Sequence, residues 1–316
     1  MITRITCIIP MFRTAQVTAK LIDELLRCEV PANVRLSILV VDDDSGDGSA
    51  ESIEAVAPPC VRVIRNPANL GRSRTRNAGG LLAESEYLLF LDSDCIPADA
   101  TFLCQHVEAL AAGADISVGS ITGTGTGFWH HYQERVAKRR TALAQRMGAA
   151  LAATSPNFMI RREAFLGLGG FDERYLGYGF EDRDFFLRAL EAGLATAWTP
   201  AATAIHADTI DLSSIFRKMR EAGGEPAERF ARTHPAAYAT LPYAALDATR
   251  HRWLRLLRPL TSAVARLLLV IAEPRMESSA WPFGLRALVV RIIVAAAYLE
   301  GSATRPPVRT LSSKSA

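Results

Sequence analysis

The sequence lacks the cysteine spacing of a disulfide-bonded or zinc-binding protein. Its five cysteines are odd in number, scattered along the chain, and form no CxxC pair. The cysteines therefore indicate neither a disulfide framework nor a zinc site. A reducing compartment is the simplest interpretation of this pattern.

Long apolar runs are also missing. The first apolar stretch, Ile5–Ile9, is too short for a secretory leader and is stopped by Pro10, so we expect no signal peptide. Two later stretches, 260–272 and 283–299, are shorter than the roughly 20 residues of a membrane-spanning helix, and arginines interrupt both. We expect helices that lie on a membrane surface, or a shallow hairpin, in place of two full spans.

Acidic residues are scarce at the C-terminal end. Residues 250–316 contain 11 Lys and Arg against 3 Asp and Glu, whereas the preceding residues contain 25 against 30. A basic tail predicts an anionic partner, either a membrane or a nucleic acid. Because the arginines interleave with Leu, Val and Ile, the pattern favours a membrane over a nucleic acid. An interface with a second copy or another protein is the remaining alternative.

The composition is otherwise that of a globular protein, with 49% hydrophobic and 22% charged residues. Short apolar runs alternate with amphipathic segments, which predicts an α/β fold with a mostly parallel, Rossmann-like sheet flanked by helices. A compact, loop-rich stretch is expected at 155–172. Strands are expected at 5–9, 36–41, 61–64, 87–91, 116–119 and 194–198, and helices at 17–28, 49–56, 74–83, 100–111, 130–152 and 185–192.

Two of these apolar runs end abruptly in aspartates. Residues 36–41 lead into Asp42 and Asp43, and residues 87–91 lead into Asp92 and Asp94. Ligands of open α/β sheets bind beyond the carboxyl ends of the strands, so these carboxylates are expected at a ligand site. Carboxylates gathered in this way repel one another unless a divalent cation lies between them. The pattern predicts a metal-assisted nucleotide or phosphate site, and its alternative is an ordinary Asp turn.

Three further segments contain candidate binding or catalytic residues. Gly71 and the arginines of 69–79 suit an anion, although a solvated helix face is the alternative. Glu181 and Asp182 at a loop-to-helix junction can supply a general base, and they can also cap the following helix. His206 follows a strand; a single histidine is more often a packed residue, but an imidazole would complete an oxygen-rich metal site.

Together these motifs resemble an inverting family 2 glycosyltransferase of the GT-A fold. The resemblance covers about residues 5–220 and rests on the order and spacing of five motifs. They are VVDDDSGDGS at 40–49, NLGRSRTRNAG at 69–79, LDSDCIP at 91–97, GGFDERYLGYGFEDRDFFLR at 169–188, and His206.

The resemblance implies a role for each matching residue. Asp182 is the expected general base, and Glu181 beside it is the weaker candidate. Asp94 and His206, with Asp92, are the expected ligands of Mn²⁺ or Mg²⁺. The expected donor-binding residues are Pro10, Asp42, Asp43, Gly71, Arg76, Asp92, Gly169 and Gly170.

The resemblance also implies the reaction: one sugar passes from a nucleotide-diphosphate sugar to an acceptor hydroxyl, with inversion. UDP is the expected nucleotide, although Asp44 stands where the family has a small residue. The expected acceptor is a glycan or a lipid-linked molecule of cell-envelope or exopolysaccharide synthesis. A processive synthase is disfavoured because Thr249 replaces the Gln of QxxRW. The alternatives are a catalytically silent nucleotide-sugar-binding module and a nucleotidyltransferase, and residues 10–14 lack the glycine that the latter needs.

The chain is expected to divide into three parts. Residues 1–212 form the GT-A domain, 213–255 a helical connector, and 256–316 a tail of apolar and basic helices. This tail is expected to bind the cytoplasmic face of the cell membrane peripherally, and a homo-oligomer interface is its alternative use.

Overall fold

The computed structural model describes residues 2–207 and 210–305. Its contacts divide the chain into two compact units. The first comprises Met1–Leu176 and Glu181–Thr209, and the second Gly177–Phe180 and Ile210–Ala316. The last part of the expected tail, 306–316, and residues 208–209 of the expected first domain lie outside the described residues.

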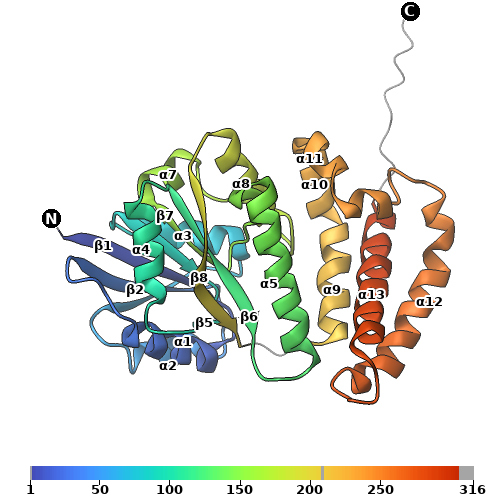
Figure 1. Ribbon diagram of the computed structural model, residues 1–316, viewed down its shortest axis with the longest axis horizontal. Helices are drawn as coiled ribbons and strands as arrows, with labels where there is room; N and C mark the ends of the chain where they lie inside the picture. The colour runs from blue at the N-terminus through green and yellow to red at the C-terminus, as the bar shows by residue number, and fades with distance from the viewer. Residues whose placement is uncertain (1, 208–209, 306–316) are drawn as a thin grey trace, which may run out of the picture. The chain divides into compact units, whose positions relative to one another are not determined.

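The first unit is built on a mixed sheet (Figure 1). Its order within the described residues is β3-β2-β1-β4-β7-β6-β8-β5. The pairs β1–β2, β1–β4, β2–β3 and β6–β8 are parallel, whereas β4–β7, β6–β7 and β5–β8 are antiparallel. The parallel half therefore follows the expectation, and the other half is mixed. The strands are β1 (Thr3–Met11), β2 (Val34–Asp42), β3 (Val61–Arg65), β4 (Tyr87–Leu91), β5 (Cys95–Pro97), β6 (Ile116–Gly123), β7 (Asn157–Arg161) and β8 (Thr196–His206).

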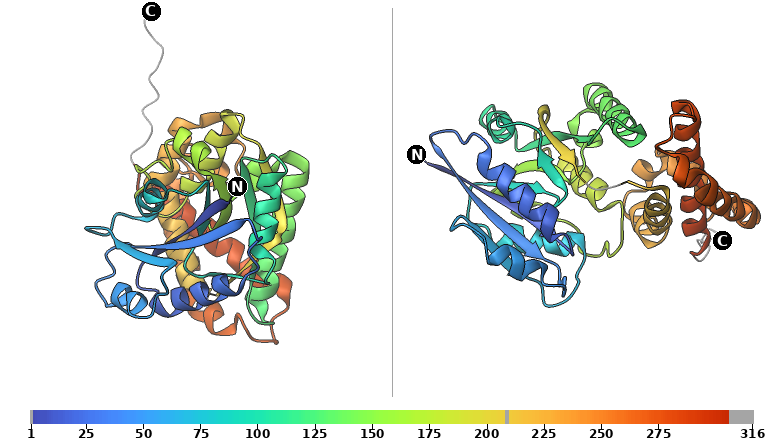
Figure 2. Two further views of the ribbon diagram at one scale, coloured as in Figure 1. Left: turned by 90° about the vertical axis from the view of Figure 1, so that its left-hand side faces the viewer. Right: turned by 90° about the horizontal axis from the view of Figure 1, so that it is seen from below.

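Helices cover both faces of this sheet (Figure 2). On β4, Leu89 and Leu91 pack against one face's core, while Leu88 and Phe90 pack against the other. The apolar runs are therefore continuous because side chains are buried on alternate sides. One core receives α1 (Ala15–Arg27), α2 (Ser49–Glu54) and α4 (Phe102–Ala111), and the other receives α3 (Arg72–Leu82), α7 (Arg162–Gly167) and α8 (Glu181–Glu191).

The expectation of a loop-rich stretch at 155–172 was wrong in its first half. β7 and α7 occupy residues 157–167, and β7 lies in the middle of the sheet between β4 and β6. The run Asn157–Arg161 was overlooked because it is short and stands among Pro and Gly residues. Its Phe158 ring stacks on Phe90 with centroids 4.9 Å apart, which explains an apolar residue at this position.

The expected bounds of three other elements were also wrong. β1 continues through Pro10 to Met11, because the pairing of β1 with β4 ends earlier, at Ile8. Proline is tolerated where a strand lacks a neighbour on one side. β8 likewise continues past Pro200 to His206, with an irregularity opposite Gly119 and Ser120. The helix expected at 130–152 is divided at Gly148 into α5 (Phe128–Met147) and α6 (Ala149–Ala152).

The described residues of the second unit form helices and connecting turns. They are α9 (Leu212–Gly223), α10 (Glu225–Thr233), α11 (Pro235–Ala239), η1 (Pro242–Leu246), α12 (Leu254–Ala272), η2 (Glu273–Arg275) and α13 (Phe283–Ala303). Glycines allow α9 and α13 to approach closely, since a Cβ on Gly301 would lie 2.0 Å from the carbonyl oxygen of Arg220. Among the described residues, no helix combines the length and the apolar character needed to cross a bilayer.

Candidate active site

The fold brings the two acidic strand ends to one edge of the sheet. β2 ends at Asp42 and β4 ends at Leu91, and both run parallel to β1 between them. The backbone N–H of Asp43 donates to the carbonyl of Met11 at 2.8 Å, which holds the end of β2 beside the end of β1. This is the edge at which open α/β sheets bind their ligands.

Arg76 and Asp92 form an ion pair at this edge. Arg76 comes from α3, is 1% exposed, and places Nη2 2.6 Å from Asp92 Oδ1. Burial alone would lower the pKa of Arg76, but the carboxylates of Asp92 and Glu181 outweigh it, and the pKa is raised. Burial alone would likewise raise the pKa of Asp92, yet Arg76 and Arg72 lower it. Both side chains are therefore charged at neutral pH.

Asp94 and His206 are brought together by the pairing of β5 with β8. Cys95 is opposite His206, and the N–H of Ala207 donates to the carbonyl of Asp94 at 2.7 Å. The His206 Nε2 atom consequently lies 3.4 Å from Asp94 Oδ2. Among the described residues, Asp92 does not join these two in a compact three-ligand cluster. Its carboxylate is engaged by Arg76 instead.

Glu181 and Asp182 begin α8, as the sequence suggested, and differ in their surroundings. Glu181 is 6% exposed, and its Oε2 has no hydrogen-bond partner among the described residues. Burial, together with the charge of Asp182, raises the pKa of Glu181 to about 7. Asp182 is half-buried and accepts the N–H of Arg183 at 2.7 Å. Asp182 is thus the more accessible carboxylate of the pair.

Asp43 fixes the loop that leads into α3. Its Oδ1 accepts from Asn66 Nδ2 at 2.7 Å and from the N–H of Leu70, and its Oδ2 accepts from the N–H of Gly71 at 2.9 Å. Gly71 precedes α3 with a φ of +83°, which favours glycine. Asp42 accepts from the backbone and hydroxyl of Ser45. The structure therefore gives Asp43 and Asp42 positioning contacts at the strand end.

The two expected donor-side glycines have a structural reason of their own. Gly169 and Gly170 have φ values of +72° and +69°. A Cβ on Gly170 would lie 2.5 Å from Asn77 Oδ1, whereas a Cβ on Gly169 would meet no atom within 4 Å. Contact with Asn77 is therefore sufficient to explain glycine at position 170, whatever the role of this residue in donor binding.

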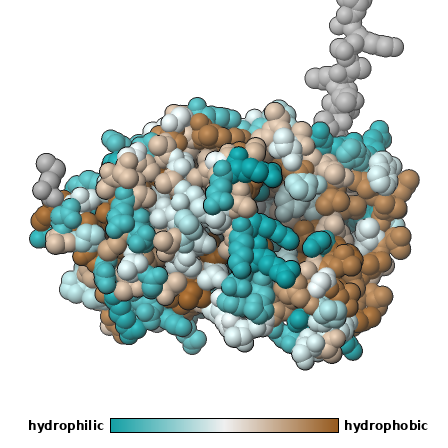
Figure 3. Space-filling model, in the orientation of Figure 1, coloured by the Kyte–Doolittle hydropathy of each residue, from teal (hydrophilic) through white to brown (hydrophobic). Residues whose placement is uncertain are grey.

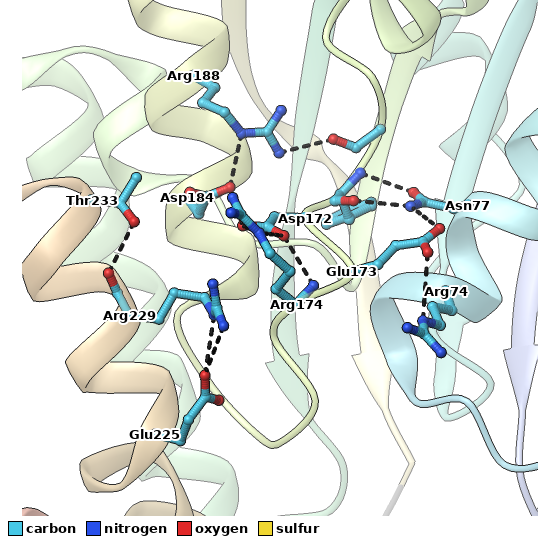
Figure 4. A network of polar contacts seen from close by, with 12 residues as sticks. Arg74, Asn77, Asp172, Glu173, Arg174, Asp184, Arg188, Glu225, Arg229 and Thr233 are labelled. Atoms are coloured by element: carbon cyan, nitrogen blue, oxygen red, sulfur yellow. Dashed lines mark hydrogen bonds and ion pairs between the residues drawn. The ribbon is translucent and has the colours of Figure 1, made fainter.

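Asn77 and Arg188 were missed by the sequence analysis and organise this loop (Figure 4). The buried Asn77 accepts from the N–H of Phe171 at 2.8 Å and donates to its carbonyl at 2.9 Å. Arg188 donates to the carbonyls of Leu168 and Gly170 and to Asp184. Asn77 lies inside the motif at 69–79, and this place in the motif is the sequence feature that could have identified it as a site residue.

A mixed α/β sheet flanked by helices, with acids at this edge, is the architecture of a GT-A-like fold. The chain matches the model of Glycosyl transferase family 2 over residues 6–169. It therefore belongs to glycosyltransferase family 2. Residues 151–209 also match the model described as the N-terminal domain of galactosyltransferase.

Individual proteins agree with this family. A pre-mycofactocin glycosyltransferase of Mycobacterium tuberculosis is 25% identical over 75% of this chain and 49% of its own length. The succinoglycan biosynthesis protein ExoO of Rhizobium meliloti is 30% identical over 37% of this chain and 33% of its own. The chain thus spans about half the length, or less, of these relatives.

A solved structure shares the fold. The mannosyltransferase PcManGT of Pyrobaculum calidifontis, in complex with GDP-Man and Mn²⁺, matches with a TM-score of 0.61. The match covers 95% of this chain and 87% of that one at 18% identity. At this identity the likeness shows the fold.

Proposed function

We propose that this transferase moves a single sugar from a nucleotide-diphosphate sugar to an acceptor hydroxyl, with inversion and with the help of Mn²⁺ or Mg²⁺. The observation that carries the proposal is the approach of Asp94 and His206, 3.4 Å apart, at the edge where Arg76, Asp92 and Asp182 also gather. UDP remains the predicted nucleotide. The GDP-Man in the structural neighbour makes GDP the first alternative to test.

The side chains of Asp94 and His206 are suitable ligands for a divalent cation. Asp94 offers a carboxylate oxygen, and His206 offers the ring nitrogen Nε2, which lies 3.4 Å from that oxygen. These two residues would hold the cation beside the bound nucleotide, in the way that few protein ligands suffice for cations at nucleotide sites. The bound cation would supply charge that stabilises the departing diphosphate.

Arg76 would add a second positive charge beside the diphosphate. Its Nε and Nη1 atoms are buried and lack hydrogen-bond partners among the described residues. Unpaired buried donors are costly, which supports a contact with an anionic ligand. Asp92 would hold the guanidinium in place through Nη2 and come close to the ribose or the cation.

Asp182 would act as the general base. It accepts the proton of the acceptor hydroxyl while the oxygen forms a bond to the anomeric carbon. The bond from that carbon to the diphosphate breaks, and its electron pair leaves with the nucleotide. Attack opposite the leaving group inverts the sugar carbon, and no protein nucleophile is needed. The accessibility of Asp182, compared with the buried Glu181, supports this assignment.

Two variants test the proposal with a panel of UDP-, GDP- and dTDP-sugars. Asp182→Asn should lower transfer by about 10²–10⁴-fold while cation-dependent donor binding persists. Asp94→Asn should weaken cation-dependent donor binding itself. Unchanged transfer in Asp182→Asn would remove this residue from the base role. Donor binding without turnover of any acceptor would favour the silent binding module.

The second unit supports a further part of the proposal, peripheral attachment to an anionic membrane such as the cytoplasmic leaflet. Hydrophobic surface gathers over α12 in Figure 3. Apolar side chains on this helix are exposed at intervals of three and four residues: Leu256, Leu260, Val264, Leu267 and Ile271. This spacing forms one stripe along a helix. The exposed Trp253 and Arg252 immediately precede this helix, and the exposed Arg258 and Arg266 lie on the helix outside the stripe.

Charge complementarity favours lipid as the occupant of this stripe, since each arginine near an anionic leaflet contributes about 1 kcal/mol. We expect the full chain to sediment with phosphatidylglycerol vesicles, and less with phosphatidylcholine or at high salt. Leu260→Asp with Leu267→Asp should abolish sedimentation, whereas Leu81→Asp on α3, also an exposed leucine, should not. If the chain does not bind vesicles but forms a dimer that depends on these leucines, the stripe is an interface with a second copy.

A further inference from the structure

We propose that His130, His131 and Glu134, at the start of α5, form a second cation site that binds Zn²⁺ or a similar borderline divalent ion. One ligand atom of each residue lies within 4.8 Å of the others. Two imidazoles and a carboxylate are ligands typical of zinc, and three protein ligands leave one position for water or another oxygen. The proposal is independent of the transferase mechanism, which does not use these residues.

The spacing of the three residues on the helix explains the cluster. Residues three and four positions apart on a helix are neighbours on its surface. Glu134 follows His131 by three positions and His130 by four, so its carboxylate reaches both rings. The His131 Nδ1 atom lies 3.4 Å from Glu134 Oε2, and the His130 Nε2 atom lies 3.9 Å from Glu134 Oε1. Ligand atoms around tetrahedral zinc are about 3.3 Å apart, so the two histidine–glutamate distances need little change. The ligand nitrogens of the two rings, which lie within 4.8 Å of each other, would move closer together.

A hydrogen bond already prepares His130 as a ligand. Its Nδ1 atom lies 2.9 Å from the carbonyl oxygen of Gly123, at the end of β6. A carbonyl can only accept, so Nδ1 carries the hydrogen, and the neutral ring has its lone pair on Nε2. This is the nitrogen that lies toward Glu134. Metal-binding histidines usually donate their other N–H to a carbonyl or carboxylate in this manner, which fixes the tautomer and the ring.

Gly123 allows the approach of α5 that this bond requires. A Cβ at this position would lie 2.0 Å from Gln133 Oε1 and 3.1 Å from the Cα of His130. Gly123 is also the residue of β6 that pairs with His206 of β8. The cluster therefore adjoins the Asp94 and His206 pair through one strand pairing, and α5 begins beside this end of the sheet (Figure 1).

The start of a helix carries partial positive charge, which opposes a cation. The negative charge of the Glu134 carboxylate offsets this repulsion. The exposure of His131, 56% of its side chain, also leaves the open position accessible to solvent. The site is thus reachable by free Zn²⁺.

Titration of the metal-free full chain with ZnCl₂, followed by calorimetry, tests the proposal. The wild-type chain should bind one equivalent of Zn²⁺ at this site. His131→Ala and Glu134→Gln should each lower the affinity for that equivalent by about tenfold or more. Asp94→Asn should retain this equivalent, and His251→Ala, an exposed histidine of the second unit, should leave it unchanged. Co²⁺ in place of Zn²⁺ should give visible absorption bands of a four-coordinate site, and these bands should disappear in Glu134→Gln.

Three results would overturn the inference. They are a wild-type chain without such an equivalent, undiminished binding in both His131→Ala and Glu134→Gln, and loss of the equivalent in Asp94→Asn. The last result would assign the ion to the donor site. Far-ultraviolet circular dichroism of each variant verifies that its helices are intact.

Discussion

The Arg76 guanidinium, only 1% exposed, lies 2.6 Å from the carboxylate of Asp92 at the end of β4. A charge buried to this degree is stable only with a partner of opposite sign. The pair also joins α3 to the acidic loop at 92–94, and Glu181 of α8 contributes to the same field. One arginine therefore offsets carboxylates from two separate parts of the chain.

Replacing Arg76 should lower the stability of the folded chain substantially. Arg76→Gln leaves Asp92 and Glu181 without their buried counter-charge, and we expect the free energy of unfolding to fall by about 3–5 kcal/mol. Arg74→Gln is the matched control on the same helix. Arg74 is exposed, and its ion pair with Glu173 spans 3.5 Å, so less than about 0.5 kcal/mol should be lost. Urea unfolding of the two variants measures the difference, and equal losses would contradict the assignment.

Glu181 should make stability fall as the pH rises. Its pKa is about 7 in the folded chain against an ordinary 4.5, so the folded state holds the proton more tightly than the unfolded state. This contribution is present below pH 4.5 and is lost as the pH rises through 7. Glu181→Gln should therefore be more stable than wild type at pH 8, by on the order of 1–3 kcal/mol, and not at pH 4.5.

Thermal unfolding of the ligand-free chain between pH 4.5 and 8 measures this effect. Glu163→Gln on α7 is a suitable control because that carboxylate is exposed. A Glu181→Gln variant whose melting temperature follows the wild-type pH profile would show that Glu181 keeps an ordinary pKa.

His106 should have the opposite pH dependence. Asn157 Nδ2 donates to the carbonyls of Ser120 and Ala202, so its Oδ1 faces His106 and accepts from Nε2–H. His106 Nδ1 then accepts from the hydroxyl of Ser117 at 2.9 Å. The ring is fully buried, and this burial lowers the pKa of His106 from 6.5 to about 4. The neutral ring is thus the form that the core holds.

Because the unfolded chain takes up a proton near pH 6.5 and the folded chain only near 4, stability should fall by up to about 3 kcal/mol across that interval. The free energy of unfolding of His106→Gln should be lower than that of the wild type at pH 7, but it should decrease less on acidification. His251→Gln, at an exposed position, should follow the wild-type profile. Denaturant unfolding at several pH values distinguishes these outcomes. An acid slope that persists in His106→Gln would place the titration elsewhere.

The sequence was sufficient for the parts of the fold that local pattern determines. Tyr87–Leu91 was predicted with its observed bounds, because five apolar residues lie between polar neighbours. The strand at 157–161 was not predicted, since it is equally short and its place between β4 and β6 depends on partners far along the chain. Register across a sheet depends on tertiary packing, and a single short run carries little of this information.

The same limit applies to the candidate site. The motif order indicated which acids gather, but it could not indicate that Asp43 is engaged by the N–H groups of Leu70 and Gly71. It also could not identify the raised pKa of Glu181, which arises from burial. Partners and burial are properties of the folded chain, so the sequence suggested the residues of the site and their roles but not the contacts that each residue makes.

Gly169 and Gly170 offer a comparison between backbone strain alone and strain with a clash. Both have positive φ, so alanine at either should cost about 1–2 kcal/mol. At Gly170 the new Cβ would also lie 2.5 Å from Asn77 Oδ1, which accepts the N–H of Phe171. We therefore expect Gly170→Ala to lose at least about 1 kcal/mol more than Gly169→Ala, and to lower transferase activity as the loop shifts. In an Asn77→Ala background this excess should shrink, because the clashing oxygen is gone, and the double-mutant cycle should be non-additive. An additive cycle measured by urea unfolding would mean that Asn77 is not what requires glycine at position 170.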